Sequence, residues 1–219
     1  MDVRLKTPFN CIISGPSKTG KTTLVHNLLT VKNKFFKVPP NYVLLIYKYN
    51  QEIYSQMKQN GLVNELMSMD SSTLTLENLV EKVGPYKYHN GSLLIIDDSM
   101  SDITDKFSQI FTNLSHHQNC SAIFITQNLF YNKGAFRTMS LNADYFFLMR
   151  NERDKQQVKT LAKQFCPGKT DMVVQIYTEA TKHPYGYLML DFSARSCSIL
   201  RFRSKVFPNE FPLEIYLEK

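Results

Sequence analysis

Residues 11–29 read CIISGPSKTGKTTLVHNLL, an apolar run followed by a loop bounded by glycines and then by a segment with helical character. Inside it, Gly15, four further residues and Gly20-Lys21-Thr22 match the phosphate-binding loop pattern. Glycines let successive backbone N–H groups close on phosphate oxygens, and the start of a helix adds a dipole that favours negative charge. We therefore expect a nucleotide phosphate cradle made of Gly15, Pro16, Ser17, Lys18, Thr19, Gly20, Lys21, Thr22 and Thr23.

Within this cradle, two side chains have distinct expected roles. Lys21 supplies a compact cation for the β- and γ-phosphates of ATP, and Thr22 presents a hydroxyl to Mg²⁺, which prefers oxygen ligands. Lys18 is also within the loop, where either a phosphate contact or, as we favour, a solvent-facing position fits.

A second motif, LLIIDD at residues 93–98, is an apolar strand that ends in two carboxylates. We expect Asp97 to hold Mg²⁺ through a water molecule and Asp98 to orient and deprotonate the attacking water. The roles divide because neighbouring side chains at a strand end point in different directions. The structural alternative is an acidic turn without catalytic function.

A third strand-like run, residues 122–126, is followed by Gln127. If this strand lies between the first strand and the acid-bearing strand, Gln127 sits beside the phosphate loop and can sense the γ-phosphate or the attacking water. Otherwise its amide only caps a turn.

The hydrophobic pattern predicts an α/β fold. Each apolar run is short and nearly continuous, as in strands covered on both faces, and amphipathic segments alternate with these runs. Expected strands are residues 11–14, 42–47, 93–96, 122–126 and 145–149, and expected helices begin near Lys21, Gln51, Thr75, Thr104, Ala135 and Glu152. This order predicts a three-layer P-loop NTPase of the RecA-like (ASCE) type with a mostly parallel central sheet, whose ligand-binding face lies at the carboxyl ends of the strands.

The rhythm changes after residue 168. Residues 170–181 fit a strand or a short helix, and residues 187–192 and 198–203 predict an antiparallel hairpin at the sheet edge. We expect residues 1–219 to form one domain, with a core of about residues 8–170 and a C-terminal extension over 171–219.

Composition narrows the setting. The chain has 219 residues, 43% of them hydrophobic, and a formal net charge of +7, which suits a polyanionic partner or simple solubility. Cys11, Cys120, Cys166 and Cys197 show no close pairing in sequence, which favours reduced thiols. No segment predicts a secretion signal or a membrane span, so we expect a location in the host-cell interior or in the virion and no secretion.

Taken together, these motifs resemble the viral genome-packaging ATPases of the FtsK/HerA superfamily, of the poxvirus and Polinton (Maverick) kind. The resemblance covers roughly residues 8–170 and rests on residues 14–23, 93–98, 114–119, 123–130, 136–144 and 149–154. It implies a homo-oligomeric ring that uses ATP and Mg²⁺ to pull double-stranded DNA into a capsid, with capsid vertex proteins as partners. Relatives outside the viral branch more often have Glu at the position of Asp98, and the shorter side chain reaches the water less easily.

The resemblance also implies an arginine that completes the γ-phosphate site of the neighbouring subunit. Arg137 is our choice because it follows the strand at residues 122–126 and lies in the resembling stretch; Arg150 and Arg153 are alternatives, and an ordinary surface arginine is the structural reading of each.

Several basic and metal-type residues remain open. The stripe Lys155, Lys159 and Lys163 fits a solvated helix face or a DNA track, and Arg201, Arg203 and Lys205 fit phosphate contact or protection of a sheet edge. His116, His117 and Cys120 precede a strand, on the edge away from the phosphates, where loop packing or a subunit contact is the better reading than a metal site.

Two other functions use similar motifs. One is a P-loop morphogenesis or extrusion ATPase acting on single-stranded DNA at a membrane, which the lack of an apolar spanning segment disfavours. The other is a small-molecule P-loop phosphotransferase; paired acids followed by a strand-end glutamine fit attack by water better than transfer to an acceptor.

Overall fold

A computed structural model describes residues 2–69, 75–97, 113–115, 117–130, 133–210 and 212–217. Its strands are β1 (Asn10–Ser14), β2 (Tyr42–Tyr47), β3 (Glu65–Ser68), β4 (Ser92–Asp97), β5 (Cys120–Thr126), β6 (Tyr145–Met149), β7 (Tyr187–Asp191), β8 (Phe202–Ser204) and β9 (Glu214–Tyr216). Its helices are α1 (Lys21–Thr30), α2 (Lys32–Phe35), α3 (Glu52–Gln59), α4 (Leu76–Val83), α6 (Lys133–Leu141), α7 (Gln156–Phe165) and α8 (Thr170–Ala180), with 3₁₀ turns η1 (Gly84–Tyr86) and η3 (Ser198–Leu200).

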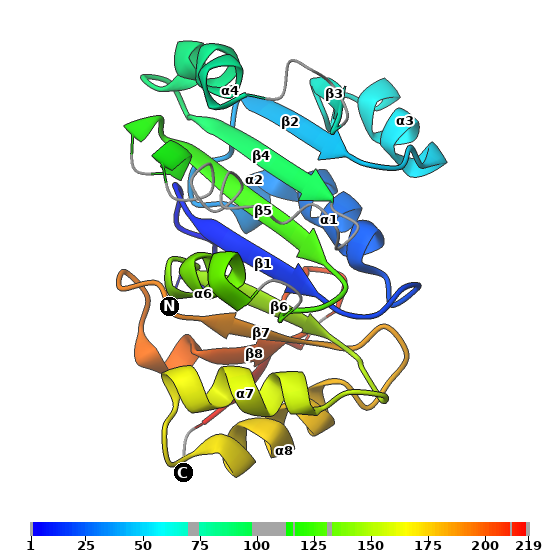
Figure 1. Cartoon of the computed structure of the whole chain (residues 1–219), viewed down its shortest axis with the longest axis vertical. Coiled ribbons are helices and arrows are strands. Elements are labelled where there is room, and N and C mark those ends of the chain that lie inside the picture. Colours follow the sequence, from blue (N-terminus) through cyan, green and yellow to red (C-terminus); the bar gives the residue numbers. More distant parts are fainter. Residues whose placement is uncertain are drawn as a thin grey trace.

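All the described strands join one sheet in the order β3-β2-β4-β5-β1-β6-β7-β8-β9 (Figure 1). The pairings from β3 to β6 are parallel, and β7, β8 and β9 add in antiparallel fashion. Strand β5 lies between β1 and β4, as the position expected for Gln127 requires. The predicted three-layer P-loop fold with a parallel sheet and a C-terminal antiparallel hairpin is therefore confirmed.

Helices cover both faces of this sheet. On one face α1, α2 and α3 pack against strand residues such as Ile13, Val43 and Ile95. On the other face α4, α6, α7 and α8 pack against residues of opposite alternation, such as Ile12, Leu44 and Leu94. The central strands are buried on both sides, which explains why they read as continuous apolar runs.

The five predicted strands match β1, β2, β4, β5 and β6 within two residues at each end. The segment at 170–181, left open between strand and helix, is helix α8, whose buried residues Val173, Ile176 and Tyr177 recur at helical spacing. The helix expected to begin near Thr104 lies outside the described residues. Strands β3 and β9 were not predicted.

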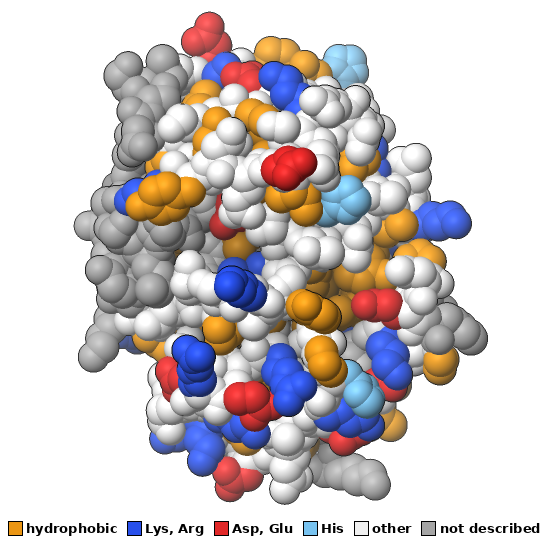
Figure 2. All heavy atoms as spheres, turned by 90° about the vertical axis from the view of Figure 1, so that its right-hand side faces the viewer, with side chains coloured by type: hydrophobic (Ala, Val, Ile, Leu, Met, Phe, Trp, Pro, Cys, Tyr) orange, Lys and Arg blue, Asp and Glu red, His pale blue; other side chains and the backbone are white. Residues whose placement is uncertain are grey.

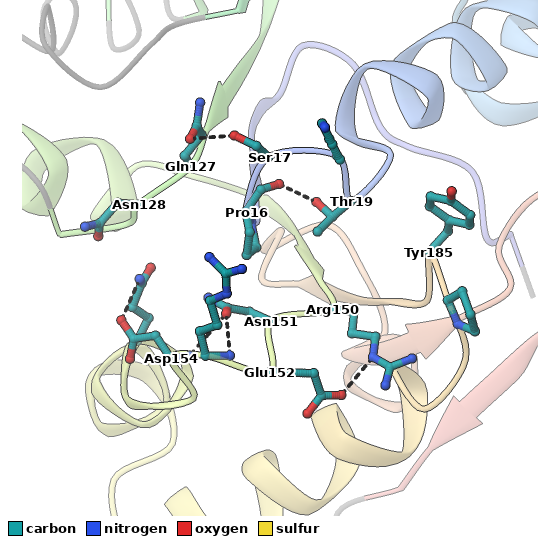
Figure 3. Close-up of a pocket in the computed structure, with 14 residues that line it drawn as sticks. Pro16, Ser17, Thr19, Gln127, Asn128, Arg150, Asn151, Glu152, Asp154 and Tyr185 are labelled. Carbon is teal, nitrogen blue, oxygen red and sulfur yellow. Dashed lines mark hydrogen bonds and ion pairs between the residues drawn. The ribbon is translucent and has the colours of Figure 1, made fainter.

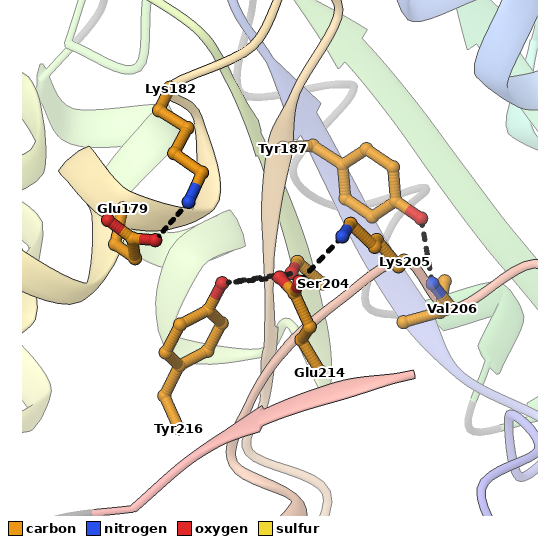
Figure 4. Close-up of polar contacts among 8 residues, drawn as sticks. All are labelled: Glu179, Lys182, Tyr187, Ser204, Lys205, Val206, Glu214 and Tyr216. Carbon is orange, nitrogen blue, oxygen red and sulfur yellow. Dashed lines mark hydrogen bonds and ion pairs between the residues drawn. The ribbon is translucent and has the colours of Figure 1, made fainter. Parts of the chain in front are cut away.

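Basic residues of the C-terminal hairpin correct one expectation. Arg203 does not face solvent: its side chain is 1% exposed and forms an ion pair with Asp191 of β7, with 2.7 Å between Nη2 and Oδ2. Phosphate contact by Arg203 is therefore wrong. Nor is β8 a free edge, because β9 pairs with it, and Lys205 contacts the Glu214 carboxylate of that added strand at 2.6 Å (Figure 4).

In the described part of the chain, no helix combines the length and the apolar character that crossing a lipid bilayer demands.

Candidate nucleotide-binding site

The phosphate loop connects β1 to α1 and is shaped by its two glycines. A Cβ atom on Gly15 would lie 2.5 Å from the Cβ of Met149 on β6, so no side chain fits there. Gly20 has a φ of 91°, a left-handed conformation that glycine adopts without strain, and it stands at the N-cap of α1. Because Gly20 has no side chain to cap the helix, backbone N–H groups of its first turn are left for an anion.

Lys21 lies in the first turn of α1, folded over the loop. Its Nζ donates to the backbone oxygens of Gly15 at 2.7 Å and Pro16 at 2.8 Å. Burial lowers the pKa of Lys21 to about 8, and the nearby Asp97 carboxylate opposes this change. A partly buried ammonium group whose hydrogen bonds go to backbone carbonyl oxygens is a good partner for a polyanion.

Thr22 and Asp97 meet at the carboxyl ends of the strands, as the sequence predicted. The Thr22 hydroxyl donates to Asp97 Oδ2 at 3.2 Å, although the two residues are far apart in sequence. Burial raises the pKa of Asp97, while hydrogen bonds from Tyr54 and Thr22 and the charge of Lys21 act in the opposite direction. A hydroxyl beside a buried carboxylate is the type of oxygen ligand set that Mg²⁺ takes, so these residues fit the ion.

Tyr54 is a member of the site that sequence reasoning missed. Its phenol, on α3, donates to Asp97 Oδ2 at 2.5 Å and accepts a hydrogen bond from the Gln51 amide at 2.8 Å. Helix α3 follows β2, which is the neighbour of β4 in the sheet, so its first turn lies beside Asp97. Only the strand order brings Tyr54 here, and the local sequence has no signal for it.

Gln127 follows β5 and lies against the phosphate loop. The Ser17 hydroxyl donates to its side-chain oxygen at 3.0 Å (Figure 3). This is the neighbourhood expected for it; its role as a sensor of the γ-phosphate or the attacking water stays a prediction. Asp98 and His116 lie outside the described residues.

The three candidate arginines lie in two places. Arg150 and Arg153 line a cavity of about 950 Å³ together with Pro16 to Thr19 of the phosphate loop, and Arg150 Nε contacts Glu152 at 2.8 Å (Figure 3). Arg137 is exposed and lies midway along α6, which runs back toward the opposite edge of the sheet. It lines a cavity of about 770 Å³ that includes residues of α6 and α7 and shares Asn128, Asp154 and Gln157 with the cavity at the phosphate loop. The expected role of Arg137 toward a neighbouring subunit stays a prediction.

The rim at the carboxyl ends of the parallel strands is a mixed surface. Figure 2 shows Lys and Arg side chains spread over this face together with acidic and apolar ones. Lys155, at the N-cap of α7, and Lys159 are partly exposed, and Lys163 is exposed; Val158 and Leu161 of the same helix are buried. All four cysteines are free thiols, and three of them are buried.

Comparison with known proteins adds the family. Residues 2–146 match the family model described as "Poxvirus A32 protein". A search of curated proteins found no significant match.

Among solved structures, one similar fold is the genome packaging NTPase B204 of Sulfolobus turreted icosahedral virus 2 in complex with AMP. The TM-score is 0.56 with 15% identity over 100% of this chain and 99% of that one. A second is EssC (ATPases 2 and 3) from Geobacillus thermodenitrificans, with a TM-score of 0.50 and 11% identity over 70% of this chain and 34% of that one. At these identities the likeness shows the fold alone, which is a P-loop ATPase fold. In this chain that fold brings Lys21, Thr22 and Asp97 together as described above. The match over two thirds of its length places the chain in the poxvirus A32 protein family of viral genome-packaging ATPases, as an ATP hydrolase.

Proposed function

We propose that this ATPase is a Mg²⁺-dependent motor that translocates double-stranded DNA into a viral capsid, working as a homo-oligomeric ring. The observation that carries the proposal is the convergence of Lys21, Thr22 and Asp97 at one rim of the sheet, with β5 and Gln127 between the two motif-bearing strands. This layout suits hydrolysis by water, because the polar side chain of Gln127 lies where water would attack the γ-phosphate.

Each residue of this chain has a defined task in the proposal. Backbone N–H groups from Gly15 to Thr23 and the ammonium of Lys21 bind the phosphates. Thr22 and Asp97 hold Mg²⁺, which neutralises charge on the β- and γ-phosphates. Asp98 takes the proton of the attacking water, and Gln127 orients that water from the end of β5.

An arginine from the neighbouring subunit completes the site. We assign this role to Arg137, because it is exposed on α6 and lies away from the phosphate loop of its own chain, as a residue acting on another subunit must. Arg150 and Arg153 remain the alternatives because they line the cavity at the loop.

The DNA contacts are to phosphates and independent of sequence. A net charge of +7 supports such contacts, and binding of this kind weakens steeply as salt rises. We further propose that residues 1–219 act as a single domain, that capsid vertex proteins anchor the ring, and that the protein works in the host-cell interior or on the virion.

ATP hydrolysis measured with and without duplex DNA at low salt tests the proposal. We expect DNA to stimulate phosphate release, and increasing salt to remove the stimulation. Lys21→Ala should abolish nucleotide binding or turnover, whereas Asp98→Asn should keep binding and stop hydrolysis. Lys34→Ala, an exposed lysine on α2, is the matched control and should behave as wild type. A hydrolysis rate indifferent to DNA at low salt would contradict the motor function, and equal loss of binding in both site variants would contradict the separate roles.

A further inference from the structure

A smaller cavity opens beside the phosphate loop, on the face of the sheet that α1 covers. Its volume is about 250 Å³ and its lining includes Gly20, Thr23, Asn27, Tyr185, Phe207 and Glu210. It shares Gly20, Thr23 and Tyr185 with the cavity of about 480 Å³ that contains Lys21, Thr22 and Asp97. The two spaces therefore meet at the start of α1.

The direction of a bound nucleotide follows from the groups already placed. If the γ-phosphate lies toward Asp97 and Gln127, the α-phosphate lies at the other end of the cradle, near Gly20 and Thr23. The nucleoside then leaves the loop on the side away from Asp97. The small cavity begins at these two residues.

Tyr185 lies where the two cavities meet and has an unusual backbone conformation. Its φ is 61°, a left-handed conformation that bulky residues rarely adopt, and yet the residue is 70% exposed. The turn that carries it is fixed at both ends: Gly186 N donates to His183 O, and Arg150 N donates to Gly186 O, each at 3.0 Å. Figure 3 shows Tyr185 and Gln127 on opposite sides of the phosphate loop. Residues in sparsely populated backbone conformations cluster at active sites and ligand clamps.

We propose that this cavity takes the adenine base of ATP, with the ring of Tyr185 stacked on the base. This inference rests on the proposed function, because it assumes that the phosphates occupy the loop. Phe207 and Met149 provide apolar walls, as base-binding cavities require. An aromatic ring at the mouth of the cavity supplies stacking area that an aliphatic side chain would not.

The polar end of the cavity points to adenine rather than guanine. Within the described residues, the contacts of Glu210 with the Tyr187 hydroxyl and the Phe207 N–H both use Oε2, so Oε1 is left to accept from a ligand. With position 6 of the purine facing Oε1, the exocyclic amino group of adenine donates to this carboxylate, whereas the O6 atom of guanine in the same position would be repelled by it.

Binding measured by calorimetry separates the base from the phosphates, with ADP and inorganic tripolyphosphate as probes. Tyr185→Asn removes the ring but keeps a residue that tolerates a left-handed backbone, and Tyr185→Phe keeps the ring. We expect Tyr185→Asn to weaken ADP binding by roughly 5- to 100-fold, the effect of removing a stacked aromatic side chain, with tripolyphosphate unchanged. Tyr185→Phe should bind both probes as wild type does.

The outcomes distinguish the two proposals. Unchanged ADP affinity in Tyr185→Asn, or an equal loss for both probes, would overturn the base site while leaving the phosphate site intact. A wild-type protein that binds neither probe would overturn the proposed function and the base site with it.

A second comparison tests the polar end of the cavity. Wild type should prefer ADP to GDP, and Glu210→Gln should narrow that preference, because an amide can also donate to O6 of guanine. The control is Glu179→Gln on α8, where Glu179 forms an exposed ion pair with Lys182 (Figure 4). An ADP-to-GDP ratio that Glu210→Gln leaves unchanged would overturn the assignment of Glu210.

Discussion

Replacing Arg203 by methionine should destabilise the protein through a single buried charge. In the wild type the guanidinium is 1% exposed and the Asp191 side chain 3%. Nη2 donates to Asp191 at 2.7 Å and Nη1 donates to the Val3 carbonyl at 2.8 Å. Methionine keeps much of the side-chain length and leaves the Asp191 carboxylate without its counter-charge. Breaking a buried pair in this way costs about 3–5 kcal/mol.

Thermal denaturation followed by circular dichroism measures this loss. In a chain of this size each kcal/mol lowers the melting temperature by about 2–4 °C, so Arg203→Met should melt roughly 6–20 °C below wild type. Adding Asp191→Asn should restore part of the difference, because the asparagine carries no charge that needs a partner. Lys163→Met, at an exposed position on α7, is the control. A melting temperature within about 2 °C of wild type, or a double variant less stable than Arg203→Met alone, would refute this account of the pair.

Three further variants test other parts of the structure. Tyr54→Phe should weaken Mg²⁺-dependent nucleotide binding by roughly tenfold or more, because the hydrogen bond to the charged Asp97 carboxylate is lost, while binding in EDTA should be unchanged. A titration with a fluorescent nucleotide checks this, and equal losses of affinity with Mg²⁺ and with EDTA would count against it. Arg137→Ala should keep nucleotide binding but reduce ring-dependent turnover, and mixing it with Asp97→Asn subunits should restore activity at shared interfaces; failure at every mixing ratio would argue against action in trans. The hydrogen bond from Lys205 holds the pKa of Glu214 at about 2, below its usual 4.5, so the pair stabilises the protein above pH 4.5 and loses this effect as the pH falls toward 2. The melting difference between wild type and Lys205→Met should therefore be small at pH 7 and shrink over that range, whereas a constant difference would show that the pair is not its cause.

Much of the fold could be predicted because its central strands are buried on both faces. Runs such as residues 42–47 and 122–126 then contain little but apolar residues, which is the composition expected of strands covered on both faces. Strand β3 escaped because it is a short edge strand, ELMS, with only Met67 buried. Strand β9 is shorter still, and its side chains are exposed or only partly buried.

The residues of the site also fall into a predictable group and an unpredictable group. Lys21, Thr22, Asp97 and Gln127 were predictable because each follows a recognisable strand, and the carboxyl ends of parallel strands meet at one rim. Tyr54 and Tyr185 were not, because they come from elements whose place depends on the strand order and on a loop between α8 and β7.

For Arg203, the sequence led to a wrong prediction rather than to a missed residue. Alternation along a strand suggested a solvent-facing arginine, but the charge that neutralises it lies on the adjacent antiparallel strand, at Asp191. Such a pairing across the hairpin depends on register and on the burial of both side chains, which local sequence does not record.

The placement of β5 has a consequence for how the nucleotide-binding site keeps its geometry. Adjacent strands lie about 4.8 Å apart, so one intervening strand sets β1 and β4 roughly 10 Å from each other. In the proposed site this strand spacing sets the distance between the phosphate loop and the metal-binding Asp97, and Gln127 follows the strand between them. The hydrogen-bonded ladder from Asn10 to Ser14 and from Ser92 to Asp97 fixes that spacing. In the proposed ring, loops and neighbouring subunits could then move while the distance between the cradle and the metal-binding acid stays constant.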